Sequence, residues 1–191
     1  MGAYLDEGFN TPLLDQVGEE FAEMFPEIFK DAPLQMRWAY SYDSERQLGI
    51  RMHGDSFAVN CNLWVTPDSA NLDKDSGGLR VWTVPAPLEW DFASFNTLKA
   101  GDKMAALVAD GEEVVIPYRA NRMVLFKSDL FHATDSFDFR KGFENRRINL
   151  TFLFGGRGQG EDAASIAQRT KDAKCSGRGT CRSKQKRRQG N

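Results

Sequence analysis

The segment NRRINLTFLF, residues 145–154, alternates between apolar and polar side chains. Successive side chains of a β-strand point to opposite faces, so this pattern predicts a strand with one apolar and one polar face. The apolar face carries Ile148, Leu150, Phe152 and Phe154. The polar face carries Arg147, Asn149 and Thr151. This segment sets the expectation of a β-sheet protein.

A second segment, FAVNCNLWVT at 57–66, alternates in the same way. Its apolar face carries Phe57, Val59, Cys61, Leu63 and Val65. Its other face carries Asn60, Asn62 and Trp64. Two strands with matching polar faces predict a polar pocket between two sheets, lined by these side chains and Thr151. A half-exposed sheet with its polar face toward solvent would give the same alternation.

Further short apolar runs predict strands, and Asp-, Asn-, Gly- and Pro-rich turns separate them. The predicted strands are 34–43, 49–53, 57–66, 78–84, 112–118, 122–127, 129–133 and 145–154. Residues 11–30 predict a helix, because apolar residues recur at three- and four-residue spacing, with a kink or end at Pro26. A mainly β double-stranded β-helix (a cupin-like jelly roll) with a supporting N-terminal helix is the expected fold. An up-and-down barrel or a sandwich would need a similar number of strands.

Charge is distributed unevenly along the 191 residues, although the net charge is only −2. Residues 157–191 are rich in Lys and Arg and lack Phe, Tyr, Trp, Leu, Val and Met, so they cannot add to a core. The sequence therefore predicts one domain at 1–156 and a basic, disordered tail at 157–191. Such a tail can bind nucleic acid through phosphate contacts, or it can remain a solvated end.

Cysteine is scarce, which argues against a disulfide scaffold and fits a reducing compartment. No apolar run is long enough to span a bilayer, which takes about 18 residues. The first residues, MGAYLDEGFN, lack the basic and apolar regions of a signal peptide. We therefore expect a cytoplasmic protein with no membrane partner.

The chain contains only two histidines, His53 and His132. In an extended segment His53 and Asp55 point to the same side, and His132 can join them from a later strand. Two imidazoles and one carboxylate on one face of an octahedron leave positions open, which suits non-haem Fe(II). A structural zinc site would fill all four of its positions, usually with Cys. Either histidine could instead be an ordinary hydrogen-bonded residue.

Arg147 is predicted to point into the protein. A buried guanidinium needs an anionic partner, because an unpaired buried charge is costly, and it can bind a carboxylate through two parallel hydrogen bonds. Arg146 is the alternative candidate, but Arg147 shares its face with Asn149.

Four motifs in this order resemble the 2-oxoglutarate/Fe(II)-dependent dioxygenase superfamily, in particular its phytanoyl-hydroxylase-like and prolyl-hydroxylase-like branches. They are HGD at 53–55, DSGGLRVWTVP at 75–85, SDLFHAT at 128–134 and RRINLTFLFG at 146–155. The resemblance covers roughly 34–155. It implies a double-stranded β-helix that binds Fe(II) and uses 2-oxoglutarate and O₂ to oxidise a primary substrate, which the sequence does not identify.

Carried onto this sequence, the resemblance makes His53, Asp55 and His132 the iron ligands. Arg147 and Asn149 become the co-substrate-binding pair, with Asn149 standing where the family usually has Ser. The His of some branches that follows the second motif is missing, which departs from a phytanoyl-type pattern. Related halogenases carry a small residue in place of Asp55, so its carboxylate favours hydroxylation. Tyr40, Tyr42 and Trp90 are candidate substrate contacts.

Two other functions fit part of the sequence. A cupin-like metal isomerase or a sugar-binding jelly roll would keep the fold without needing Arg147. A nucleic-acid-associated protein would depend on the basic tail instead.

Overall fold

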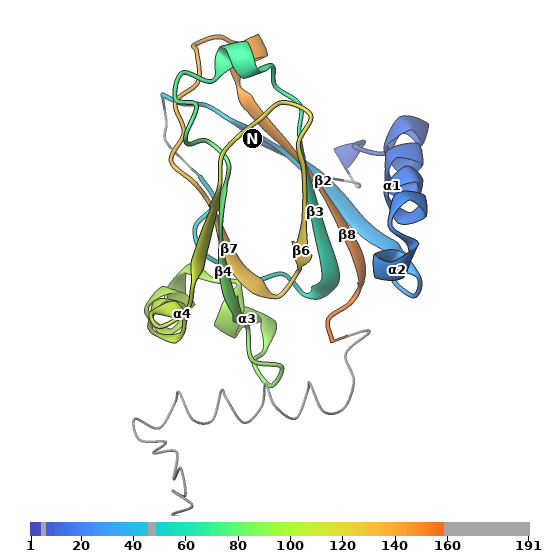
Figure 1. Cartoon of the computed structure of the whole chain (residues 1–191), viewed down its shortest axis with the longest axis vertical. Helices are drawn as coiled ribbons and strands as arrows, with labels where there is room; N and C mark the ends of the chain where they lie inside the picture. The colour runs from blue at the N-terminus through green and yellow to red at the C-terminus, as the bar shows by residue number, and fades with distance from the viewer. Residues whose placement is uncertain (5–6, 46–48, 159–191) are drawn as a thin grey trace, which may run out of the picture.

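The computed structural model describes residues 1–4, 7–45 and 49–158. Two antiparallel β-sheets face each other (Figure 1). The strands are β1 Gly2–Tyr4, β2 Leu34–Tyr42, β3 Phe57–Trp64, β4 Leu79–Pro85, β5 Glu113–Ile116, β6 Met123–Lys127, β7 Leu130–Thr134 and β8 Arg147–Gly156. The helices are α1 Pro12–Met24, α2 Pro26–Phe29, α3 Phe92–Phe95 and α4 Gly101–Val108. The described part of the chain is thus mostly β, as predicted.

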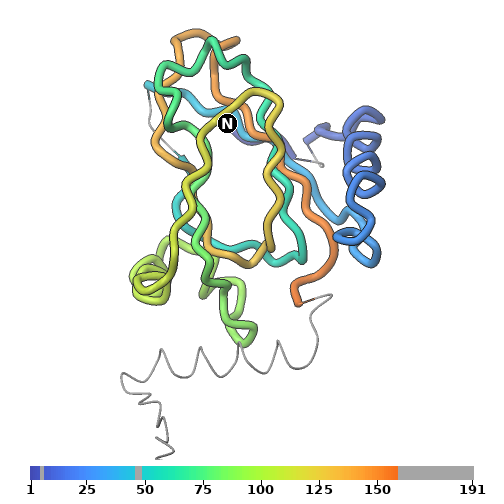
Figure 2. Tube along the Cα trace, viewed as in Figure 1, coloured from blue at the N-terminus to red at the C-terminus, as the bar shows by residue number. Residues whose placement is uncertain are grey.

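The larger sheet has the strand order β1-β2-β8-β3-β6, and the smaller has the order β5-β4-β7. The decisive segment at 145–154 forms β8 at the centre of the larger sheet, between β2 and β3. Its pairing places Tyr42 opposite Arg147 on one side and Trp64 opposite Asn149 on the other. Figure 2 traces how the chain passes between the sheets from β3 to β8.

Helices α1 and α2 cover the outer face of the larger sheet (Figure 1). Thr11 caps the start of α1, and Pro26 begins α2, so the predicted helix is interrupted where proline predicted it. Phe21 meets Phe152 edge-on, with ring centroids 5.4 Å apart. The apolar face of β8 therefore packs on helices rather than facing solvent.

The polar face of the larger sheet is also buried, between the two sheets. Asn60, Asn62, Arg147, Asn149 and Thr151 are all at most 6% exposed. This excludes the half-exposed sheet with its polar face toward solvent and confirms that the two polar strand faces meet inside the molecule.

Two details differ from prediction. The predicted strand at 49–53 is wrong: His53 forms an isolated bridge to His132 and Ile50 bonds to Thr134, but the segment is not a continuous strand. Strand β1 was not predicted and is too short to carry a pattern. Residues 88–109 contain α3, a 3₁₀ turn at Leu98–Ala100 and α4.

Residues 159–191, with nearly all of the predicted basic tail and its possible nucleic-acid contacts, lie outside the described residues. Arg157 is described, and it is held firmly. It donates hydrogen bonds to the carbonyls of Ala86, Pro87 and Trp90, and its guanidinium lies over the ring of Phe95 at 4.3 Å. Arg157 thus connects the end of β8 to the loop that precedes α3. In the described part of the chain, no helix is both long and apolar enough to cross a membrane.

Candidate metal centre

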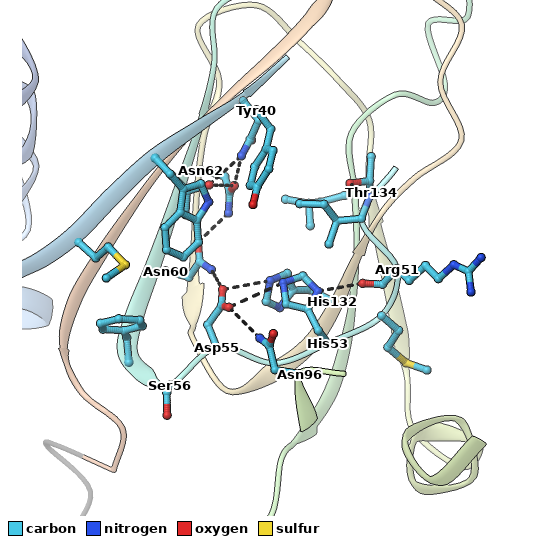
Figure 3. A pocket seen from close by; sticks show the side chains of 18 of the residues that line it. Tyr40, Arg51, His53, Asp55, Ser56, Asn60, Asn62, Asn96, His132 and Thr134 are labelled. Carbon is cyan, nitrogen blue, oxygen red and sulfur yellow. Dashed lines mark hydrogen bonds and ion pairs between the residues drawn. The ribbon is translucent and has the colours of Figure 1, made fainter. Parts of the chain in front are cut away.

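His53, Asp55 and His132 meet between the two sheets (Figure 3). One ligand atom from each lies within 4.8 Å of the others. The Nε2 atoms of His53 and His132 are 3.7 Å and 3.5 Å from the two carboxylate oxygens of Asp55. The sequence therefore predicted correctly which three side chains come together.

Backbone hydrogen bonds bring the three segments together. The amide of His53 donates to the carbonyl of His132, and the amide of His132 donates to the carbonyl of His53. The amide of Asp55 donates to the carbonyl of Ser128, in the turn between β6 and β7. These bonds fix the two imidazoles side by side, with ring centroids 4.3 Å apart.

Each imidazole has its tautomer set by the backbone. Nδ1 of His53 lies 2.8 Å from the carbonyl of Arg51, and Nδ1 of His132 lies 2.8 Å from the carbonyl of Leu130. A carbonyl can only accept, so each Nδ1 carries the proton and, in a neutral ring, each Nε2 presents a lone pair. Three acceptors then converge on one point, an arrangement that a cation stabilises.

Electrostatics keep these ligands ready for a cation. Burial, followed by the nearby His132, lowers the pKa of His53 to about 4, so its ring is neutral at pH 7. Burial works against ionisation of Asp55, but the two imidazoles and the Asn60 amide outweigh it and hold the pKa of Asp55 below its usual value. The site therefore offers a neutral His53 imidazole and an ionised Asp55 carboxylate at neutral pH, the forms that bind metal.

Amide side chains support the carboxylate. Asn60 donates to Oδ2 of Asp55 at 2.9 Å, and Asn96 donates to Oδ1 at 3.4 Å and to the carbonyl of Gly54 at 2.6 Å. The amide of Gly54 in turn donates to the carbonyl of Phe95. Asn96 was not predicted, because it lies in an irregular segment without a motif.

The polar network continues from Asn60 along the inner face of the larger sheet. Asn62 donates to Asn60 at 2.7 Å, and Asn149 donates to Asn62 at 2.6 Å. Thr151 donates to Asn62 at 3.1 Å. All four predicted polar residues of this face thus belong to one hydrogen-bonded chain that begins at Asp55.

Arg147 lies near the far end of this chain and is 1% exposed. Its Nε donates to the carbonyl of Gly77, and one Nη donates to the carbonyl of Gly78 at 3.0 Å. The other, Nη1, is buried and has no hydrogen-bond partner among the described residues. Burial lowers the pKa of Arg147, which measures the cost of enclosing this cation.

Aromatic rings surround the guanidinium of Arg147. It lies 4.8 Å from the ring of Tyr42, 5.7 Å from Trp64 and 5.9 Å from Tyr118. Trp64 is fully buried and stacks on Tyr118. Trp64 is not among the residues that line the cavity and instead lies against the guanidinium of Arg147, behind the cavity wall.

Two glycines make room for Arg147. Gly77 has a φ of +84°, a conformation that favours glycine. A Cβ on Gly78 would lie 1.8 Å from the carbonyl oxygen of Ile116. The alternative, Arg146, instead pairs with Asp43 at 3.2 Å near the surface. The structure thus favours Arg147 over Arg146 as the inward-facing cation.

One cavity of about 510 Å³ joins the three ligands to Arg147. Every residue proposed for the site except Trp64 lines it, and so do Tyr40 and Tyr42. Trp90 does not line it, and packs instead against Phe131 and Lys103. Trp38 and Met36 were missed, although alternation with Tyr40 and Tyr42 along β2 would have placed them on the same face.

No protein-family model matches this chain, and no curated protein sequence matches it. Solved structures do resemble it at low identity. EvdMO1 has 14% identity and a TM-score of 0.48 over 72% of this chain and 30% of its own. AviO1 from Streptomyces viridochromogenes Tue57 has 14% identity and a TM-score of 0.48 over 75% of this chain and 61% of its own. SnoK, a non-heme alpha-ketoglutarate-dependent carbocyclase from nogalamycin biosynthesis, has 9% identity and a TM-score of 0.43 over 70% of this chain and 55% of its own. This chain spans less than two thirds of each of these proteins.

Proposed function

We propose that this chain is a mononuclear non-haem Fe(II) and 2-oxoglutarate-dependent oxygenase, most simply a hydroxylase, built on a double-stranded β-helix. The observation that carries the proposal is the pairing of two features in one cavity. At one end three acceptor atoms converge, and at the other a buried guanidinium has an Nη without a partner. A metal and a dicarboxylate would satisfy both ends at once.

The strand order supports the β-helix. Strands β2, β8, β3 and β6 share one sheet, and β5, β4 and β7 share the other, so the chain crosses between sheets after β3, β5, β6 and β7. Such alternation is what a jelly roll requires. The bridge between His53 and His132 would place residues near His53 at the free edge of the smaller sheet.

The donor set suits Fe(II) better than a closed zinc site. It supplies two nitrogens and one carboxylate and no thiolate. Cys61, the free cysteine in the described part, lies in the core cluster beneath α1, and burial raises the pKa of its thiol. When bound, Fe(II) together with 2-oxoglutarate supplies O₂ activation coupled to decarboxylation of 2-oxoglutarate to succinate and CO₂.

The protein's own residues would hold and orient the reactants. Nε2 of both histidines and the Asp55 carboxylate would bind the metal on one face, which leaves its other positions open. Asn60 and Asn96 would keep the carboxylate in its orientation. Arg147 would bind the distal carboxylate of 2-oxoglutarate through Nη1, and Asn149 and Thr151 lie beside its path. The rings around Arg147 would keep water away from this ion pair.

The experiment is an anaerobic titration of the metal-free chain with Fe(II) and then 2-oxoglutarate, followed by addition of O₂. We expect a visible charge-transfer absorption only when both are present, and succinate formation with O₂. His132→Ala should abolish both signals, whereas Arg140→Ala, a change at an exposed arginine bound to the carbonyl of Ser69, should leave both intact. Metal binding without any 2-oxoglutarate binding would instead indicate a non-redox jelly roll.

A further inference from the structure

The inner face of the larger sheet carries two chemically different strips. The polar strip lies on β3 and β8 and consists of Asn60, Asn62, Arg147, Asn149 and Thr151. The aromatic strip lies on β2 and consists of Met36, Trp38 and Tyr40, which alternate along the strand and all line the cavity. Cross-strand pairing sets Tyr40 beside Asn149 and Trp38 beside Thr151, so the two strips run next to each other.

The two strips differ in what they can bind. The polar strip is committed, because its amides bond to one another and to Asp55, and Arg147 is the site for a carboxylate. The aromatic strip offers mainly apolar surface. The hydroxyl groups of Tyr40 and Tyr4 bond to each other, and the two rings meet edge-on with centroids 6.0 Å apart. What remains for a ligand is therefore mainly the apolar surface of the rings and of Met36, together with the indole N–H of Trp38.

Charged side chains do not serve this part of the cavity. Among the described lining residues, Asp55 and the histidines belong to the metal site, and Arg147 lies at the opposite end. The remaining charge is on Arg51, whose side chain is exposed and extends away from the three ligands (Figure 3). Burial further raises the pKa of Tyr40, so its hydroxyl stays neutral. An anion placed over the aromatic strip would lose water without gaining a partner. A cation would be attracted by the ring faces, but the described lining offers it no carboxylate apart from Asp55, which belongs to the metal site.

The size and rim of the cavity match a small molecule. About 510 Å³ lies within the usual range of small-molecule pockets, roughly 300–1,000 Å³, and 2-oxoglutarate must share it. At the rim, Phe92 and Leu98 are 57% and 72% exposed, so apolar surface continues outward from the cavity. An occupant of one or two rings fits this space.

We propose that the primary substrate is an uncharged small molecule that lays a flat, apolar face on the aromatic strip of β2, beside the 2-oxoglutarate on the polar strip. This inference rests on the proposed oxygenase function for its meaning, but it depends on different residues. It can therefore be tested by binding alone.

The test uses the full chain with Fe(II) and saturating 2-oxoglutarate, kept anaerobic, and three probes of one shape. These are neutral 2-naphthol, anionic 2-naphthoate and the protonated 2-naphthylmethylamine, with affinities from equilibrium dialysis. We expect 2-naphthol to bind about tenfold or more tightly than either ion. Trp38→Ala should weaken 2-naphthol on the order of tenfold, as loss of a central aromatic contact does. Leu13→Ala, a change at an exposed position of α1, should not alter any of the three affinities.

A second variant, which adds a charge to the aromatic strip, distinguishes a specific effect on binding from loss of folding. Met36 is 41% exposed, so Met36→Lys should fold, and it should reverse the preference toward 2-naphthoate. Equal affinity for all three probes, or no change in either variant, would refute the inference. Succinate formation is measured separately: selective naphthol binding without succinate would sink the oxygenase proposal and leave the aromatic site standing, whereas succinate without selectivity would do the reverse.

Discussion

Nδ2 of Asn60 donates a 2.9 Å hydrogen bond to Oδ2 of Asp55, and this one bond sets the direction of the whole amide chain. A carboxylate only accepts, so Asn60 must turn its amide nitrogen toward it and its oxygen toward Asn62. Asn62 then donates to Asn60 and accepts from Asn149. The chain ends at Oδ1 of Asn149, which is buried without a hydrogen-bond partner among the described residues. The carboxylate of Asp55 therefore fixes which way the amide groups of Asn60, Asn62 and Asn149 point, up to the Arg147 end of the cavity.

Asn60→Ala should weaken metal binding by roughly 10- to 100-fold, because loss of a partner that orients a ligand typically has this effect. The variant removes the donor to Asp55 and leaves Nδ2 of Asn62 without its acceptor. The measurement is a Co(II) titration of the metal-free protein. Asn145→Ala is the control, since the side chain of Asn145 bonds to Lys141 and Glu144 near the surface. Equal affinities for the two variants would contradict the proposed support of Asp55.

Arg147→Lys should weaken 2-oxoglutarate binding by about 10- to 100-fold while metal affinity stays unchanged. The planar guanidinium of Arg147 can donate to the carbonyls of Gly77 and Gly78 and to a carboxylate simultaneously. Lysine keeps the charge but lacks this fork of donors. Isothermal titration of the anaerobic metal complex with 2-oxoglutarate checks this. Arg122→Lys serves as the control, because Arg122 bonds to the carbonyl of Pro117 away from the cavity. An unchanged 2-oxoglutarate affinity would rule Arg147 out as the anchor.

Acid should destabilise the metal-free protein through His53. Its pKa is about 4 in the folded protein, whereas a free imidazole has a pKa of about 6.5, so between these values the unfolded state binds the extra proton. Stability is therefore fully present above about pH 6.5 and falls as the pH drops toward 4, by up to about 3 kcal/mol at 1.36 kcal/mol per pKa unit. Urea unfolding between pH 4 and pH 7 measures it. His53→Asn should flatten that slope, and a slope unchanged in the variant would assign it to other groups.

Arg157→Ala should lower the free energy of unfolding by about 2–4 kcal/mol. A hydrogen bond to a charged group contributes about 1.5–3 kcal/mol, and the three bonds of Arg157 are not additive because they come from one side chain. It should also weaken metal binding, because the loop that Arg157 holds leads into α3, and Asn96 follows α3 directly. Thermal unfolding and Co(II) titration provide the two readouts. Arg80→Ala, at an exposed pair with Glu113, should change neither by a comparable amount. Stability loss with metal affinity intact would show that the loop does not act on the site.

Gly78→Ala should prevent folding or cost several kcal/mol, because the new Cβ would lie 1.8 Å from the backbone oxygen of Ile116, which cannot move aside as a side chain can. Gly101→Ala provides the contrast. It lies at the start of α4 with no atom within 4 Å of a built Cβ, so it should be neutral or stabilising by up to about 1 kcal/mol. Expression and thermal unfolding of both variants decide the matter, and a Gly78→Ala protein as stable as the parent would contradict this packing.

The alternation of side chains along the strands predicted which residues share a face. The alternation of β3 and β8 placed Asn60, Asn62, Arg147, Asn149 and Thr151 on one face, and that face is the cavity wall. Trp64 has the same alternation but lies under Arg147, because a face says nothing of how far along the strand the cavity extends. Asn96 and Arg157 act through side-chain hydrogen bonds made from irregular segments, and such contacts depend on the finished fold rather than on a local pattern.

The paired backbone bonds between His53 and His132 bear on how the protein folds. The two residues are distant in sequence, and the chain between them contains β3 to β6. This part of the chain must therefore fold before the metal site exists. A metal ion then has nothing to bind in the early stages and should leave the refolding rate unchanged. A bound ion should instead lower the unfolding rate, because it stabilises the folded protein without stabilising the transition state for folding.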